Sequence, residues 1–136
     1  MIIAVDLDNT ICDARWREHL IGEQGWAAYD DACTKDEPVL TMINLLQALG
    51  CIHDLIVLTE RHERLRVPTN KLLAAWTVPI QEVLMRTEGN FMPAPELKMH
   101  LAAGGIHMMI DDSDAVLEAF RGRGVATMQF TMESRK

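Results

Sequence analysis

The stretch Ile2-Ile3-Ala4-Val5-Asp6-Leu7-Asp8-Asn9-Thr10 decides the fold. Residues 2–7 form a short apolar run, interrupted only by Asp6, which is typical of a strand buried on both faces of a parallel sheet. The polar end of the stretch brings two carboxylates together, because side chains at positions i and i+2 of an extended segment point the same way. Asp6 and Asp8 can therefore face one ligand at the end of this strand.

Helical and extended patterns alternate through the rest of the chain. Residues 38–49 carry an amphipathic stripe, with Pro38 in the first turn and Gly50 at the C′ position. Further strands are expected over 52–59, 82–85, 106–110 and 125–130, and further helices over 69–77, 95–103 and from a Ser113 cap to Gly122. This order predicts an α/β fold, a doubly wound parallel sheet with helices on both faces. Residues 11–36 are the least regular and are expected to form an excursion over the edge of the sheet.

Length and composition set the class of protein. The 136 residues are 49% hydrophobic and 24% charged, which predicts one globular domain over 1–136. With 13 basic and 20 acidic residues the net charge is −7, which excludes a protein that coats nucleic acid or anionic membranes non-specifically. The apolar runs are too short to cross a membrane, the N-terminus does not resemble a signal peptide, and the three cysteines lack metal-ligand spacing. We therefore expect a cytoplasmic protein without a membrane partner.

Polar clusters follow three of the predicted strands, at the edge where ligands bind in open parallel sheets. They are Asp6 to Thr10, Thr59-Glu60-Arg61 and Asp111-Asp112-Ser113, and Lys98 precedes the last of them. Carboxylates this close would repel one another, and Mg²⁺, which prefers oxygen ligands, would relieve the repulsion. A carboxylate beside such an ion can attack phosphorus, and a second one can move the proton.

The order Asp6-x-Asp8-x-Thr10, Thr59, Lys98 and Asp111-Asp112 resembles the haloacid dehalogenase-like (HAD) phosphatase superfamily over nearly the whole chain. The narrower likeness is to the phosphatase half of bacteriophage polynucleotide kinase/3′-phosphatases and its stand-alone relatives. Its segments are Trp26-x-x-Tyr29, Asp36-x-Pro38, Thr59-x-Arg61-x-x-x-x-Arg66-x-x-Thr69, Met85-Arg86-x-x-Gly89 and Glu96-Leu97-Lys98. The sequence has no GxxxxGK[ST] phosphate-binding loop of a kinase half. The resemblance implies a Rossmann-like HAD core over 1–136.

The resemblance also implies a role for each matching residue. Asp6 would be the nucleophile and a Mg²⁺ ligand, and Asp8 would be the general acid/base with its backbone carbonyl on the metal. Thr59 would bind the transferring phosphoryl oxygens, and Lys98 would neutralise charge on Asp6 and the phosphate.

Further positions are implied around these four. Of the acidic pair, Asp112 is expected to bind Mg²⁺ directly and Asp111 to support it, although some branches use the first residue of the pair. Phosphate- or substrate-binding positions would be Asn9, Thr10, Arg17, Glu60, Arg61 and Arg86. Two departures stand out: Glu60 replaces the usual glycine, and Ala94 replaces an aspartate whose orienting role Glu96 could take.

The gaps between the motifs leave room for only a minimal cap, which by analogy favours an open site and a large substrate. Seven basic residues are expected to form a basic rim: Arg15, Arg17, Arg61, Arg64, Arg66, Lys71 and Arg86. Trp16 and Trp26 could stack a base, or could pack over the sheet.

The function expected from all of this is a Mg²⁺-dependent phosphomonoesterase that acts on nucleotides or 3′-phosphate nucleic-acid ends. The alternatives are a 5′-(deoxy)nucleotidase or broad small-metabolite phosphatase and, in another class, a phosphate-binding HAD domain without turnover. The intact Asp6/Asp8 pair argues against the last of these. A functional pairing with a separate kinase or ligase is an accompanying expectation.

Overall fold

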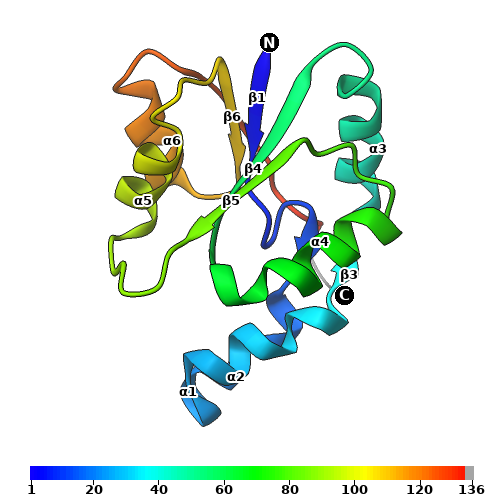
Figure 1. Cartoon of the computed structure of the whole chain (residues 1–136), viewed down its shortest axis with the longest axis vertical. Helices are drawn as coiled ribbons and strands as arrows, with labels where there is room; N and C mark the ends of the chain where they lie inside the picture. The colour runs from blue at the N-terminus through cyan, green and yellow to red at the C-terminus, as the bar shows by residue number, and fades with distance from the viewer. Residues whose placement is uncertain (134–136) are drawn as a thin grey trace.

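The strand β1 (Ile2–Val5) lies at the centre of a five-stranded parallel sheet with the order β5-β4-β1-β6-β7 (Figure 1). The other strands are β4 (Asp54–His62), β5 (Glu82–Arg86), β6 (Met108–Asp111) and β7 (Ala126–Gln129). In the register of this sheet Ile3 pairs with Leu55 on one side and with Met108 on the other. This computed structural model describes residues 1–133, so the last three residues of the expected domain 1–136 lie outside the described residues. The predicted doubly wound α/β sheet is confirmed.

Alternate residues of β1 enter different cores. Ile3 and Val5 pack into a cluster that includes α3 (Leu40–Leu49) and α4 (Arg66–Ala75), whereas Ala4 belongs to a cluster with α5 (Ala94–Leu101) and α6 (Asp114–Arg121). All three side chains are essentially fully buried. Figure 1 shows α3 and α4 on one side of the sheet and α5 and α6 on the other. The apolar run therefore forms a central strand because both of its faces are covered.

Some helix boundaries differ from the prediction. The Ser113 hydroxyl caps α6 by accepting the Val116 N–H at 3.4 Å, as predicted. Pro38 lies in the short strand β3 (Glu37–Pro38), and α3 begins only at Leu40. Gly50, predicted at the C′ position, is the C-cap residue of α3 and has a right-handed φ of −65°. Pro68 lies inside the first turn of α4, where backbone N–H groups have no acceptor within the helix, so a residue without an N–H breaks no helical hydrogen bond.

The excursion expected over 11–36 is present and spans 12–38, closed at its base by the antiparallel pairing of β2 (Cys12–Asp13) with β3. The excursion holds two short helices, α1 (His19–Gln24) and α2 (Trp26–Asp31), which project beyond the sheet (Figure 1). Single 3₁₀ turns flank these helices, and another turn, η3 (Glu63–Leu65), follows β4. The two helices were not predicted, because each has only six residues and neither has a capping side chain.

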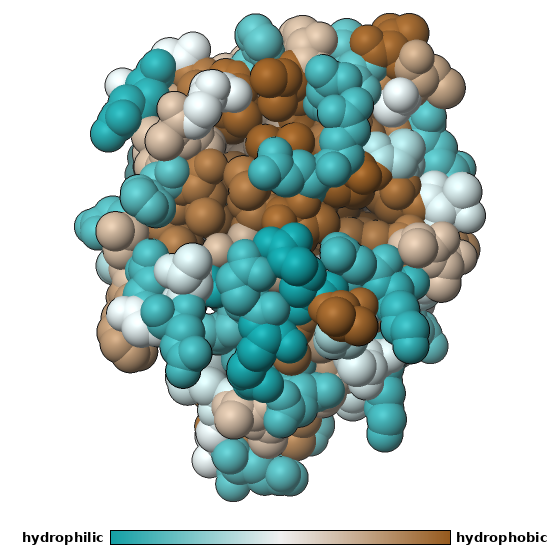
Figure 2. Space-filling view, viewed as in Figure 1, coloured by the Kyte–Doolittle hydropathy of each residue, from teal (hydrophilic) through white to brown (hydrophobic). Residues whose placement is uncertain are grey.

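Hydrophobic and hydrophilic side chains separate clearly on the face drawn in Figure 2. Hydrophobic residues gather over β4 and β5, and hydrophilic ones predominate towards α1 and α2. None of the helices within residues 1–133 has the length and apolar character needed to cross a bilayer.

Two glycines at helix ends allow a matched test of the packing. A Cβ at Gly50 would lie 2.6 Å from the Pro79 ring, whereas a Cβ at Gly122 would meet nothing closer than a carbonyl oxygen at 3.4 Å. We expect Gly50→Ala to lower the free energy of unfolding by about 1–3 kcal/mol, and Gly122→Ala to change it by less than about 0.5 kcal/mol. Chemical denaturation of both variants measures the difference, and equal effects would contradict the close approach of α3 to Pro79.

Candidate active site

The chain turns sharply after β1 and directs two carboxylates to the carboxyl edge of the sheet. The Asp6 N–H still donates to the Ile110 carbonyl at 2.9 Å, so Asp6 extends the strand. Asn9 then adopts a left-handed φ of 65°, which asparagine tolerates better than most residues, and its side chain accepts the Ala14 N–H. The Thr10 hydroxyl donates to Asp6 Oδ2 at 3.0 Å. Asn9 and Thr10, predicted as substrate-binding positions, thus shape the turn and fix Asp6.

Lys98 links the nucleophile candidate to the acidic pair. Its Nζ donates to Asp6 Oδ1 at 2.6 Å and to Asp111 Oδ2 at 2.7 Å, and all three side chains are buried. Burial raises the pKa of Asp6 well above its usual range, and this outweighs the opposing effect of Lys98. Burial acts to lower the pKa of Lys98, but the two carboxylates raise it, so the ammonium stays charged. Glu96, considered as an orienting group, is exposed and does not line the cavity formed here.

Three carboxylates of this cluster fit a hard divalent cation. Asp6, Asp111 and Asp112 each offer an oxygen, and these oxygens lie within 4.8 Å of one another. Asp111 is committed to Lys98 and to the Ser113 N–H, whereas Asp112 is exposed. Three carboxylates against one ammonium leave negative charge that an oxygen-liganded Mg²⁺ would compensate. Asp6 and Asp112 are therefore the residues that would hold the ion.

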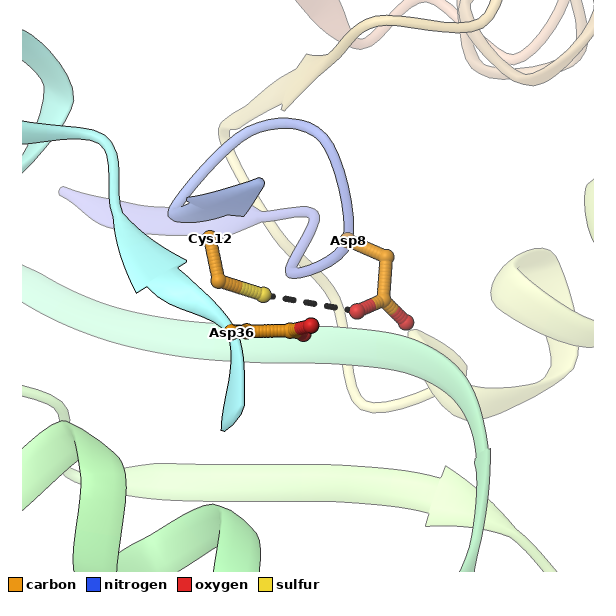
Figure 3. Close-up of side chains that lie close together, drawn as sticks. All are labelled: Asp8, Cys12 and Asp36. Atoms are coloured by element: carbon orange, nitrogen blue, oxygen red, sulfur yellow. Dashed lines mark hydrogen bonds between the residues drawn. The ribbon is translucent and has the colours of Figure 1, made fainter. Parts of the chain in front are cut away.

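The carboxylate of Asp8 belongs to a separate, charge-neutral network. Arg17 and Arg61 donate to Asp8 Oδ1 at 2.8 and 2.7 Å, and both also bind the buried Asp36. Cys12 donates its thiol to Asp8 at 3.3 Å beside Asp36 (Figure 3). Burial acts to raise the pKa of Asp8, but Arg61 and Arg17 outweigh it and lower the pKa. Although Asp8, Cys12 and Asp36 lie close enough to share a metal, the two guanidinium groups already neutralise them.

The arginines predicted to contact substrate do not all reach open space. Arg17 is 1% exposed and Arg61 is 3% exposed, and each is directed to Asp8 and Asp36. Arg86 donates to backbone carbonyls of residues 60, 90 and 92, so it holds the loop after β5. The sequence spacing shows where an arginine occurs, but it does not show which carboxylate takes its guanidinium.

The expected basic rim is also largely neutralised. Arg15 pairs with an aspartate two residues before it, at 2.9 Å, and Arg66 pairs with a glutamate three residues before it, at 2.7 Å. Arg64 contacts Asp31 and Asp30 on α2. Exposed pairs of this kind contribute little to stability, but they remove free positive charge from around the site.

Thr59 and Glu60 are the first two residues of the predicted second cluster. Thr59 is 1% exposed, and its hydroxyl oxygen accepts the Arg61 N–H at 3.1 Å, which leaves its own proton available to a ligand. Glu60 is exposed at the mouth of the site. Glu60, at the position where the resemblance predicts a glycine, thus carries its charged side chain to solvent, while Arg61 is directed inward to Asp8 and Asp36.

The three predicted clusters and Lys98 all contribute residues to the lining of one cavity of about 740 Å³. The residues that line it include Asp6, Asp8, Thr59, Arg61, Lys98, Asp111 and Asp112. The sequence analysis assigned no role to Asp36, Cys12, Tyr29 and Phe91, which contribute to the network or to the wall. The pattern Asp36-x-Pro38 was the only signal for Asp36.

Asp112 gives a pH-dependent test of the acidic cluster. Desolvation of its carboxyl group, with Asp111 beside it, raises its pKa to about 6, so the folded metal-free protein binds this proton more tightly than the unfolded chain does. Stability is therefore lost as the pH rises from about 4 to about 6. Because the residue is exposed, we expect Asp112→Asn to raise the free energy of unfolding above pH 6 by only about 1 kcal/mol, with no gain below pH 4.

Denaturation at several pH values without metal measures this gain. The control is Asp114→Asn, which removes an acid from the first turn of α6 and should lower stability at neutral pH. Added Mg²⁺ should raise the melting temperature of the parent and not that of Asp112→Asn. A loss of stability in metal-free Asp112→Asn at pH 8 would show that the charged Asp112 carboxylate does not destabilise the folded protein beside Asp111.

The comparisons with known proteins support this architecture. No family model matches the chain, and no curated protein matches it. A chain of the Pnkp1/Rnl/Hen1 complex superposes with a TM-score of 0.79 at 20% identity, over 98% of this chain and 47% of that one. A chain in a second structure, of the Pnkp1/Rnl/Hen1 RNA repair complex, superposes with a TM-score of 0.79 at 20% identity, over 96% of this chain and 42% of that one. The chain thus spans about half the length of these relatives.

Two further structures extend the likeness. A haloacid dehalogenase-like family hydrolase from Streptococcus pneumoniae gives a TM-score of 0.68 at 12% identity, over 94% of this chain and 83% of that one. The HAD domain of the effector Lem4 from Legionella pneumophila, an inactive mutant, gives a TM-score of 0.53 at 14% identity, over 96% of this chain and 84% of that one. Such low identities carry the fold alone, and on that ground the chain has a haloacid dehalogenase-like fold.

Proposed function

We propose that this protein is a Mg²⁺-dependent phosphomonoesterase that works through a phosphorylated Asp6. The observation that carries the proposal is the setting of Asp6, which is bound by Lys98 and Thr10 beside Asp112 at the floor of the cavity. A carboxylate held in one orientation at a buried site is suited to attack phosphorus. When bound, Mg²⁺ would supply the positive charge that brings the phosphate and the carboxylate together.

The reaction divides into two steps in which Asp8 moves the proton. An Asp6 oxygen forms the bond to phosphorus, the bond to the leaving oxygen breaks, and Asp8 gives that oxygen a proton. A water then loses its proton to Asp8 and attacks the acyl phosphate, which frees Asp6 and inorganic phosphate. Thr59 and Lys98 would bind the phosphoryl oxygens as charge moves onto them.

The two arginines around Asp8 favour its carboxylate form, which is the form that accepts a proton from water. To act as an acid it must first take up a proton. A phosphate dianion arriving beside Asp8 would raise its pKa and so promote this uptake. The network therefore supports both halves of the cycle only when substrate is present.

The substrate class proposed is nucleotides or 3′-phosphate nucleic-acid ends. Its support is the likeness to a chain of an RNA repair complex and the small size of the excursion that borders the cavity. Pairing with a separate kinase or ligase belongs to the same proposal. Cysteines that form no disulfide, two of them buried, are consistent with a cytoplasmic location.

A phosphate-release assay with Mg²⁺ tests the proposal across 3′-phosphorylated oligonucleotides, 5′-mononucleotides and sugar phosphates. We expect 3′-ends or mononucleotides to be hydrolysed best, and Asp6→Asn to lose at least about 10³-fold in kcat because the nucleophile is removed. The control is Asp54→Asn, at the opposite edge of the sheet, which should keep full activity. Preference for sugar phosphates would overturn the substrate class, and full activity of Asp6→Asn would overturn the mechanism.

Arg61 provides a test of the proton-transfer role. Without its guanidinium, burial would raise the pKa of Asp8, so we expect Arg61→Gln to shift the kcat/KM profile of the phosphatase by about 1 pH unit toward higher pH. Arg64→Gln, which removes an exposed arginine paired with α2, should leave the profile in place. A drop in rate at every pH without a shift would show that Arg61 does not tune Asp8.

A further inference from the structure

Two exposed aromatic side chains line the same cavity as the carboxylates. Trp26 on α2 is 65% exposed, and Phe91 in the loop after β5 is 88% exposed. Neither ring is taken into the core, whereas Phe120 is 1% exposed between the sheet and its helices. The sequence left open whether Trp26 packs or binds, and its exposure rules out packing over the sheet.

The indole of Trp26 is held in place despite its exposure. It meets the Tyr29 ring edge-on, with centroids 5.6 Å apart and planes at 88°. The Tyr29 ring in turn lies under the Arg17 guanidinium at 4.2 Å, and Arg17 is fixed by Asp8 and Asp36. A ring that is already ordered loses little entropy when a ligand stacks on it.

The backbone around Phe91 is fixed as well. Arg86 donates to the carbonyls of Asn90 and Met92 at 3.1 and 2.8 Å, and the Asn90 side chain accepts the Met92 N–H at 2.9 Å. These bonds hold the residues on both sides of Phe91. The phenyl ring is therefore presented to solvent from an anchored loop.

The charged groups around these rings disfavour a second phosphate. Glu18, Asp30 and Glu60 line the same cavity. Arg86 also lines it, but its guanidinium is bound by backbone carbonyls around the loop after β5, and Arg64 nearby is paired with carboxylates of α2. A flat, uncharged group with polar edges suits such a wall better than a polyanionic backbone does. Aromatic side chains stack on any base through its π-face.

We infer that Trp26 and Phe91 form a stacking site for an unpaired nucleobase, the one that belongs to the nucleotide whose phosphate reaches Asp6. This inference rests on the proposed function and adds that the substrate is recognised by its base. The site would discriminate base-bearing phosphate esters from abasic ones and from sugar phosphates.

The test compares a 3′-phosphorylated single-stranded dinucleotide with the same molecule lacking its 3′-terminal base. In the parent we expect the base to improve kcat/KM at least about 10-fold, mainly through KM. Trp26→Ala and Phe91→Ala should each reduce this advantage several-fold, and Trp26→Phe should retain more of it than Trp26→Ala. Ile52→Ala, which truncates an exposed apolar residue that does not line the cavity, is the control and should keep the parent's ratio.

The outcomes separate the two proposals. Equal hydrolysis of the two molecules, or an unaltered ratio in both alanine variants, would overturn the stacking site and leave the phosphatase standing; the aromatic pair would then be a surface for something other than a base. If no phosphate ester is hydrolysed, the proposed function fails. In that case quenching of tryptophan fluorescence by adenosine monophosphate tests the stacking site. Quenching that is lost in Trp26→Phe would still support stacking, and quenching that persists in Trp26→Phe would overturn it.

Discussion

The ammonium of Lys98, buried between Asp6 and Asp111, is the interaction on which the rest of the site depends. It joins three elements, since α5 supplies the lysine and the ends of β1 and β6 supply the carboxylates. None of the three charges could be buried alone, because each would lose its hydration without compensation. The same contact that secures α5 on the sheet therefore also orients the nucleophile candidate.

The site divides its carboxylates into two sets with different electrostatic character. Asp6, Asp111 and Asp112 share one ammonium and retain excess negative charge, which suits a cation. Asp8 and Asp36 share two guanidinium groups and are neutral as a unit. Two aspartates only two residues apart thus have pKa values shifted in opposite directions: burial raises the pKa of Asp6, whereas Arg61 and Arg17 lower the pKa of Asp8 against the effect of burial.

The sequence was sufficient where local pattern and tertiary structure agree. The buried strand at residues 2–5 follows from hydrophobicity and the Ser113 cap from local capping chemistry. The strand predicted to end at Thr59 instead continues to His62, with a shift in its pairing with β5 after Leu58. Asp6 and Lys98 lie in contact, as predicted from their places in the sequence. The chemical roles assigned to them stay predictions.

The features that the sequence did not predict depend on contacts between distant segments of the chain. The destination of Arg17 depends on Asp36, nineteen residues away, and on Tyr29, and no local pattern encodes that choice. The helices α1 and α2 are too short to show a periodicity of their own. Arg17 nevertheless connects the two proposed sites, because its one guanidinium contacts Asp8, the proposed proton carrier, and also lies over the Tyr29 ring that Trp26 meets. A substitution of Tyr29 on α2 would therefore also disturb Asp8, because Arg17 contacts both residues. Natural variation at Tyr29 should be accompanied by compensating change around Asp8.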